Sequence, residues 1–172
     1  TALSFANTAG AILDLSTNGI TPTVASLSGG GSTGGNISFG ASITTTLTVG
    51  NASNTTYSGL ISGASLTTGG LVKVGSGILT LGHTANTYTG TTTITAGELR
   101  LNPSTITGSF ASQIVLNGGK LSTTSIAAST VFTSTSTLKL DATSTIDLGS
   151  NAHDLKFAAS NGVTWNGTAL VI

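Results

Sequence analysis

The residues of this chain that could do chemistry are few and lie far apart. The segment Gly30-Gly31-Ser32-Thr33-Gly34 fits the G-x-S-x-G pattern of a serine nucleophile. Such a serine needs a strand before it, a helix after it and a histidine base beside it. Here it lies in a run of glycine and serine with no helix signal, so we interpret the segment as a loop.

The two histidines and five acidic residues offer no second route to catalysis. We expect His83 and His153 in exposed turns, and on a strand His153 and its neighbour Asp154 would point to opposite faces. Paired or clustered carboxylates serve sugar hydrolysis and calcium binding. The acids here are scattered, and we expect Asp141 and Asp147 to be solvated surface charges. The chain has no cysteine for a thiol nucleophile or zinc–thiolate site. The sequence therefore predicts no catalytic residue, metal site or cofactor, and no enzyme.

The composition narrows the class of partner. The 172 residues include 34 Thr, 23 Ser and 24 Gly, and the five basic and five acidic residues give zero net charge. Zero charge removes the attraction to nucleic acid or to an anionic membrane surface, so we expect neither partner. No apolar run approaches the ~18 residues of a spanning helix. A surface so poor in charge favours self-association. The missing cysteines are compatible with an exported bacterial protein. The first residue, Thr1, is not an initiator Met, so we expect a chain that was processed by removal of a leader or excised from something longer.

Short apolar triplets alternate with period two along the whole chain, which is typical of strands with one buried face. Examples are Leu3-Ser4-Phe5, Leu47-Thr48-Val49, Val72-Lys73-Val74, Leu99-Arg100-Leu101 and Leu138-Lys139-Leu140. Each charged residue stands at the centre of a triplet or directly beside an apolar residue. We therefore expect all ten charged side chains to point outward, including Lys73 and Glu98. Trp165 is in phase with Val163 and is expected in the core, with a sugar-stacking platform as the alternative.

The strand spacing fits either a β-sandwich or a solenoid. The threonine content and the aromatic fraction of 5% favour thin stacked coils with β-branched neighbours. Asn-Gly pairs, which begin at residues 18, 117, 161 and 166, would instead make tight hairpins, so a small antiparallel cap near the C-terminal end stays open. We predict an all-β chain with a single solenoid domain over 1–172, built from about seven short coils. Residues 138–172 would form its terminal coils or a cap.

Residues 72–101 read VKVGSGILTLGHTANTYTGTTTITAGELRL. This segment resembles the autotransporter-associated β-strand repeat of bacterial passenger proteins. The matching positions are Gly75, Gly77, Leu79, Thr80, Leu81, Asn86, Thr87, Tyr88, Thr89, Gly90, Thr92, Ile94, Gly97, Leu99 and Leu101. The resemblance implies a right-handed parallel β-helix that is exported and serves as a stalk or adhesive scaffold. Within it we expect Asn86 to hydrogen-bond backbone in a turn and Tyr88 to pack against a coil edge.

These observations predict a non-enzymatic, extracellular or cell-surface structural protein of a bacterium. Both ends of the chain alternate without side-chain charge, and unpaired strand edges tend to associate. We therefore expect head-to-tail contacts between copies, which would propagate into a fibre or matrix. The residues expected at that assembly interface are Leu3, Phe5, Leu170, Val171 and Ile172. The alternative is an adhesin passenger segment that binds a glycan or the surface of a host or neighbouring cell.

Overall fold

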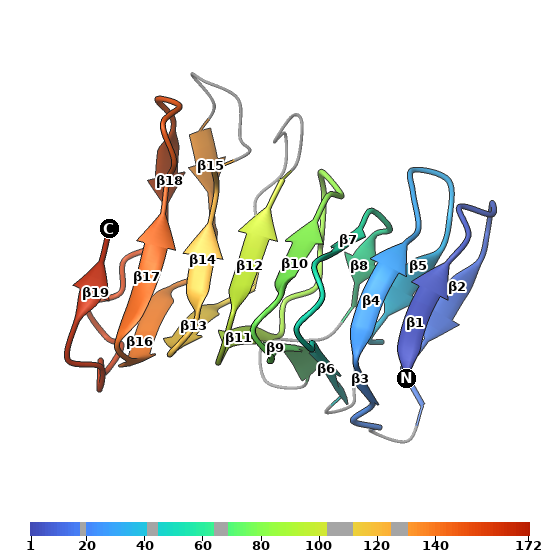
Figure 1. Ribbon diagram of the computed structural model, residues 1–172, viewed down its shortest axis with the longest axis horizontal. Coiled ribbons are helices and arrows are strands. Elements are labelled where there is room, and N and C mark those ends of the chain that lie inside the picture. Colours follow the sequence, from blue (N-terminus) through green and yellow to red (C-terminus); the bar gives the residue numbers. More distant parts are fainter. Residues whose placement is uncertain (18–19, 41–44, 64–68, 103–111, 125–130) are drawn as a thin grey trace.

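The computed structural model describes residues 1–172 except 18–19, 41–44, 64–68, 103–111 and 125–130. The described strands stack side by side into an elongated parallel β-solenoid, with the N-terminus at one end and the C-terminus at the other (Figure 1). Within the described ranges there is no α-helix, and every registered pair of strands is parallel. The predicted all-β solenoid is confirmed.

Two large sheets form the body. Sheet 1 faces the viewer in Figure 1 and has eight strands. In order they are β1 (Ala2–Phe5), β4 (Ser26–Gly29), β7 (Thr55–Tyr57), β10 (Ile78–Leu81), β12 (Glu98–Leu101), β14 (Lys120–Ser122), β17 (Ser144–Asp147) and β19 (Leu170–Val171). Sheet 2 has six strands. They are β3 (Thr23–Val24), β6 (Thr45–Val49), β9 (Gly69–Lys73), β11 (Thr91–Ile94), β13 (Ile114–Asn117) and β16 (Leu138–Ala142).

Shorter strands complete some of the turns between sheet 1 and sheet 2. One small sheet contains β2 (Ile12–Asp14), β5 (Asn36–Ser38) and β8 (Ile61–Ser62), and another contains β15 (Val131–Thr133) and β18 (Asp154–Lys156). Among the described residues, six turns place a strand in both large sheets, slightly fewer than the seven coils expected. The turns differ in length, because sheet 1 pairs Ile78 with Glu98 but Gly29 with Tyr57. The repeat is thus held by stacking and not by a constant residue count.

The core consists of ladders in which each inward side chain lies on its partner in the next turn. In sheet 2 one ladder runs through Leu47, Leu71, Thr92, Ile114 and Leu138, and the next through Val24, Val49, Lys73, Ile94, Leu116 and Leu140. The buried aliphatic members join one continuous cluster that extends through the other strands. Fully burying one such side chain contributes roughly 1.5–3 kcal/mol, so the ladders dominate the stability of the stack.

The Asn-Gly pairs that begin at residues 117 and 166 do not make hairpins. Asn117 and Gly118 lead from β13 in sheet 2 to β14 in sheet 1. The backbone N–H groups of Asn166 and Gly167 both donate to the carbonyl oxygen of Leu140, at 2.8 and 3.1 Å, so this pair lies along the edge of β16. The described C-terminal strands all pair in parallel, so the antiparallel cap is wrong. The stacking of each inward residue on the previous turn outweighs the local preference for a hairpin turn. The Asn-Gly pair at 18–19 lies outside the described residues.

Candidate functional site

The segment with the nucleophile pattern is a corner of the solenoid between β4 and β5. The backbone N–H of Gly31 donates to the carbonyl oxygen of Gly34, at 3.0 Å. The N–H groups of Thr33 and Gly34 both donate to the side-chain oxygen of Asn7 in the preceding turn, at 3.1 and 3.2 Å. No helix follows this segment in the described ranges, so the loop interpretation holds. The backbone of this corner is therefore bound to the neighbouring turn, and the exposed Ser32 does not precede a helix.

Both histidines are half-buried and hydrogen-bonded. The Nε2 atom of His153 lies 2.8 Å from Thr123 Oγ1, and its Nδ1 atom lies 2.9 Å from the carbonyl oxygen of Asn151. The Nδ1 atom of His83 accepts a hydrogen bond from the N–H of Ala85, at 3.1 Å, and burial lowers the pKa of its ring. Within the described part of the chain, no group of three His, Cys, Asp or Glu residues could hold a metal ion.

A charged cluster instead crosses three neighbouring strands of sheet 1. Glu98 on β12 pairs with Arg100 at 2.7 Å and with Lys120 on β14 at 2.6 Å, and Lys120 also contacts Asp147 on β17 at 3.2 Å. The Glu98 side chain is only 8% exposed. Burial by itself would raise the pKa of Glu98, but its bonds to Lys120 and Arg100 outweigh burial and hold that pKa below its ordinary value. This cluster ties successive turns together.

Lys73 departs from the expected outward direction of the charges. Its side chain is 1% exposed and lies in the core ladder between Val49 and Ile94. The ammonium group donates to the carbonyl oxygens of Val74 and Gly75, at 2.7 and 2.8 Å, and to that of Ala96, at 3.3 Å. The expectation that every charge points outward is therefore wrong at this residue. A shift of one residue in register moves a side chain to the opposite face, and stacking on Val49 decides that register.

Two residues of the repeat motif are structural. The side-chain oxygen of Asn86 accepts a hydrogen bond from the N–H of Ile61 in the preceding turn, at 2.9 Å, as expected for a turn asparagine. Tyr88 is fully buried, with its ring edge against Phe39 at a centroid distance of 5.7 Å, so it packs inside the core and not at a coil edge. Its hydroxyl lies 2.6 Å from Thr92 Oγ1, and burial raises the pKa of the phenol.

The five residues predicted for assembly lie at the two ends of sheet 1. Leu3 and Phe5 on β1 are half-buried, and Phe5 packs edge-on against Tyr57 at 5.7 Å. At the other end Leu170 is half-buried, whereas Val171 is 55% and Ile172 is 82% exposed. β1 and β19 are the edge strands of the sheet (Figure 1), so the geometry leaves one row of backbone groups unpaired on each.

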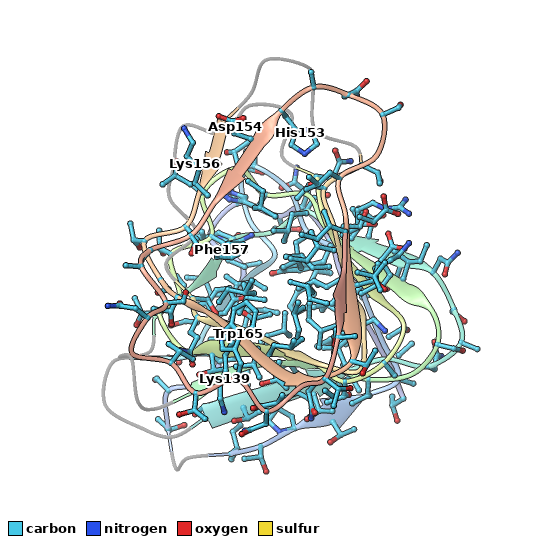
Figure 2. The ribbon with its side chains drawn as sticks, turned by 90° about the vertical axis from the view of Figure 1, so that its left-hand side faces the viewer. Lys139, His153, Asp154, Lys156, Phe157 and Trp165 are labelled. Atoms are coloured by element: carbon cyan, nitrogen blue, oxygen red, sulfur yellow. The ribbon has the colours of Figure 1, made fainter. Side chains whose placement is uncertain are left out.

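The sequence pattern placed Trp165 in the core, and this expectation is wrong. The side chain is 44% exposed near the C-terminal end of the solenoid, beside Lys139 in the view along its axis (Figure 2). Its indole N–H donates to the carbonyl oxygen of Leu138, at 3.2 Å. The segment around it is not a strand, so period-two alternation does not apply there. The sequence signal for this exposed position is that the tryptophan stands alone among turn residues.

The chain is similar to a known repeat family and to a known bacterial protein. Residues 71–101 match the family model described as passenger-associated-transport-repeat. The chain is 41% identical over 128 residues to "Adhesin BmaC autotransporter" of Brucella suis biovar 1 (strain 1330). That match covers 69% of this chain and 4% of the adhesin's length. No solved structure matches the chain.

The chain is thus an autotransporter passenger repeat protein, located at the bacterial cell surface or outside the cell. Within the described ranges, no helix has the length and apolarity needed to cross a membrane.

Proposed function

We propose that this chain is a structural segment of an adhesin passenger, which holds a binding surface away from the bacterial cell. The observation that carries the proposal is the unbroken parallel stack, because its register runs through all eight strands of sheet 1. At ~4.8 Å per strand this stack extends the surface by about 34 Å. The identity to an autotransporter adhesin supports the adhesive part of the role.

The proposed role is non-enzymatic. Several polar groups near the candidate residues join neighbouring turns: Asn7 accepts from the N–H of Thr33, Thr123 bonds to His153, and Lys120 binds Asp147. A nucleophile needs a base within hydrogen-bond reach, and a glycosidase needs two facing carboxylates. Neither arrangement is found among the described residues. The partner of the proposed surface is a glycan or another cell-surface component of a host or neighbouring cell.

The test is attachment of coated beads to cultured epithelial cells. Beads that carry the folded chain should attach well above albumin-coated beads. Leu99→Asp places a charge in a core ladder and should abolish both folding and attachment, whereas Ser28→Asp, at an outward position of β4, should keep both. Attachment of the folded chain at the albumin level would refute the adhesive function.

A second candidate function is head-to-tail assembly through β1 and β19. Its support is the apolar, uncharged character of both edge strands, with Val171 of β19 55% exposed. Parallel addition of one copy's β1 to another copy's β19 would extend sheet 1 into a fibre. Sedimentation at micromolar concentration should show polymers for the wild type. Val171→Lys should give monomers, while Thr93→Lys, in the middle of sheet 2, should not. A monomeric wild type would refute the assembly.

A further inference from the structure

The indole of Trp165 is held in place although it is exposed. Its N–H is bonded to Leu138, and the backbone beside it is fixed by the bonds from Asn166 and Gly167 to Leu140. Gly167 is required for this close approach, because a Cβ atom there would lie 2.6 Å from Leu140 Cγ. An aromatic ring that is already immobilised loses little conformational entropy when a ligand covers it. The geometry is therefore that of a binding platform and not of a loosely attached side chain.

Polar groups of the right kind lie beside this platform. The Lys139 ammonium donates to Asp141 Oδ2 at 2.8 Å, and the Asn166 amide donates to Asp141 Oδ1 at 3.0 Å. Asn166 is exposed, and the bond to Asp141 uses one of its N–H donors and leaves its carbonyl oxygen as an acceptor. The three side chains thus form a bonded row with both donors and acceptors. Lys139 and Asp141 belong to β16, the last strand of sheet 2, and Figure 2 shows Lys139 at the same end of the solenoid as Trp165.

We propose that Trp165, Asn166, Asp141 and Lys139 form a binding subsite for a neutral sugar, an inference that rests on the proposed adhesive function. A pyranose ring presents a face of C–H groups that stacks on an indole, and hydroxyls that need both donors and acceptors. The row carries one positive and one negative charge, so its net charge is zero. A sialylated or sulfated sugar would meet the Asp141 carboxylate without a surplus cation, which selects a neutral ligand.

The single tryptophan makes the test direct, since all indole fluorescence of the chain comes from this platform. The full chain is titrated with oligosaccharides of glucose, galactose, mannose and N-acetylglucosamine, and with sialylated and sulfated sugars. We expect a saturable fluorescence change with at least one neutral sugar. Calorimetry then follows the variants. Trp165→Ala and Asn166→Ala should each weaken binding at least about tenfold, and Trp165→Phe should weaken it less than Trp165→Ala.

Asn161→Ala is the matched control, because Asn161 belongs to the other exposed Asn-Gly pair of the same terminal turn and should leave binding unchanged. Melting curves show whether each variant is folded, and Trp165→Phe preserves an aromatic platform if Trp165→Ala is unstable. Three results would overturn the subsite. These are no saturable change with any neutral sugar, binding of the anionic sugars alone, or a fluorescence change with protein concentration alone, which would show a second copy covering the indole.

The bead assay separates this inference from the proposed function. Attachment by wild-type beads without any sugar binding to the chain would overturn the subsite and leave the adhesive function standing. Saturable sugar binding by a chain whose beads do not attach would support the subsite and refute the adhesive function. Loss of both properties in Trp165→Ala, with both retained in Asn161→Ala, is the result expected if the two proposals hold together.

Discussion

Replacement of Lys73 by methionine tests whether the core of this solenoid depends on a buried charge. Lys73 stands between Val49 and Ile94 in an otherwise aliphatic ladder, and its ammonium group binds the carbonyl oxygens of Val74, Gly75 and Ala96. Methionine has a similar length and suits the ladder, but it cannot donate a hydrogen bond. Lys73→Met therefore removes the charge and its three bonds with little change in packing.

Two contributions to the free energy of unfolding oppose one another in this variant. A buried carbonyl oxygen left without a donor costs about 1–3 kcal/mol. The three bonds of Lys73 are partly buried, so each loss falls toward the lower end of that range. Relief from burying an ammonium group offsets part of that cost, because a buried charge is itself expensive. Since the three carbonyls belong to backbone at the corners of the coil, they cannot turn away to find other donors. We expect a net loss of about 2 kcal/mol, or a fall in melting temperature of about 4–8 °C for a chain of this size.

Lys156→Met is the matched control, because Lys156 is 57% exposed and its contact with Asp154 is 3.2 Å long. An exposed pair of this kind contributes about 0–1 kcal/mol, so its loss should barely move the melting temperature. Thermal unfolding followed by circular dichroism measures both variants. An unchanged or higher melting temperature for Lys73→Met would refute the reasoning, since it would show that burying the charge costs more than the carbonyl bonds return.

The pH dependence of the same variant provides a second measurement. Burial lowers the pKa of Lys73, although Glu98 opposes this effect. Between the lowered folded value and the ordinary lysine value, the unfolded chain binds more protons than the folded chain, so this residue makes stability rise with pH. The wild type should therefore gain stability relative to Lys73→Met as pH increases across that window. A difference that shrinks over the same range would contradict the inward placement of the ammonium group.

Three further predictions concern other contacts between turns. The pKa of Glu98 is held below its ordinary value, so its contribution to stability is present above the unfolded pKa and is lost as pH falls through the folded pKa. Glu98→Gln should therefore flatten the fall in melting temperature as the pH is lowered below the ordinary pKa of glutamate. Gly97→Ala should lower the free energy of unfolding by more than about 2 kcal/mol in denaturant titrations, because φ is +61° and the added Cβ would meet the carbonyl oxygen of Gly75. Gly162→Ala is the control, because open space surrounds that residue, and it should change the free energy of unfolding by less than about 0.5 kcal/mol. Tyr88→Phe removes a hydroxyl bonded inside the core and should cost about 1–2 kcal/mol by the same titration, while unchanged stability would show that this bond is not needed.

The repeat motif and the alternation were sufficient to predict the class of fold. In period-two triplets such as Leu79-Thr80-Leu81 and Leu99-Arg100-Leu101, the alternation itself shows which side chains face the core. The structure pairs these two strands in register. Asn86 likewise bonds backbone as a turn asparagine should. These features are local, because a strand's buried face and a turn's hydrogen bonds depend mainly on residues within a few positions.

The inward or outward placement of the candidate site residues depends on contacts between turns, and local sequence patterns do not predict such contacts. Lys73 was assigned outward from its two valine neighbours, but its register is decided by Val49 in the preceding turn. Trp165 was assigned inward from Val163, but the segment lies along the edge of β16 without forming a strand.

By itself, then, the sequence determined that this is a β-rich chain of zero net charge, because composition and period-two alternation can be read without knowing any contact between strands. The passenger type was implied by the resemblance of residues 72–101 to a known repeat. The tertiary structure alone decided which groups are buried or exposed where the pattern is ambiguous. Stacking of each turn on the one before it placed a lysine in the core, and the edge of the last strand of sheet 2 held the single tryptophan at the surface. The physical reason is that parallel stacking selects the register that buries the most apolar surface as a whole, even where one residue must then turn against its local preference.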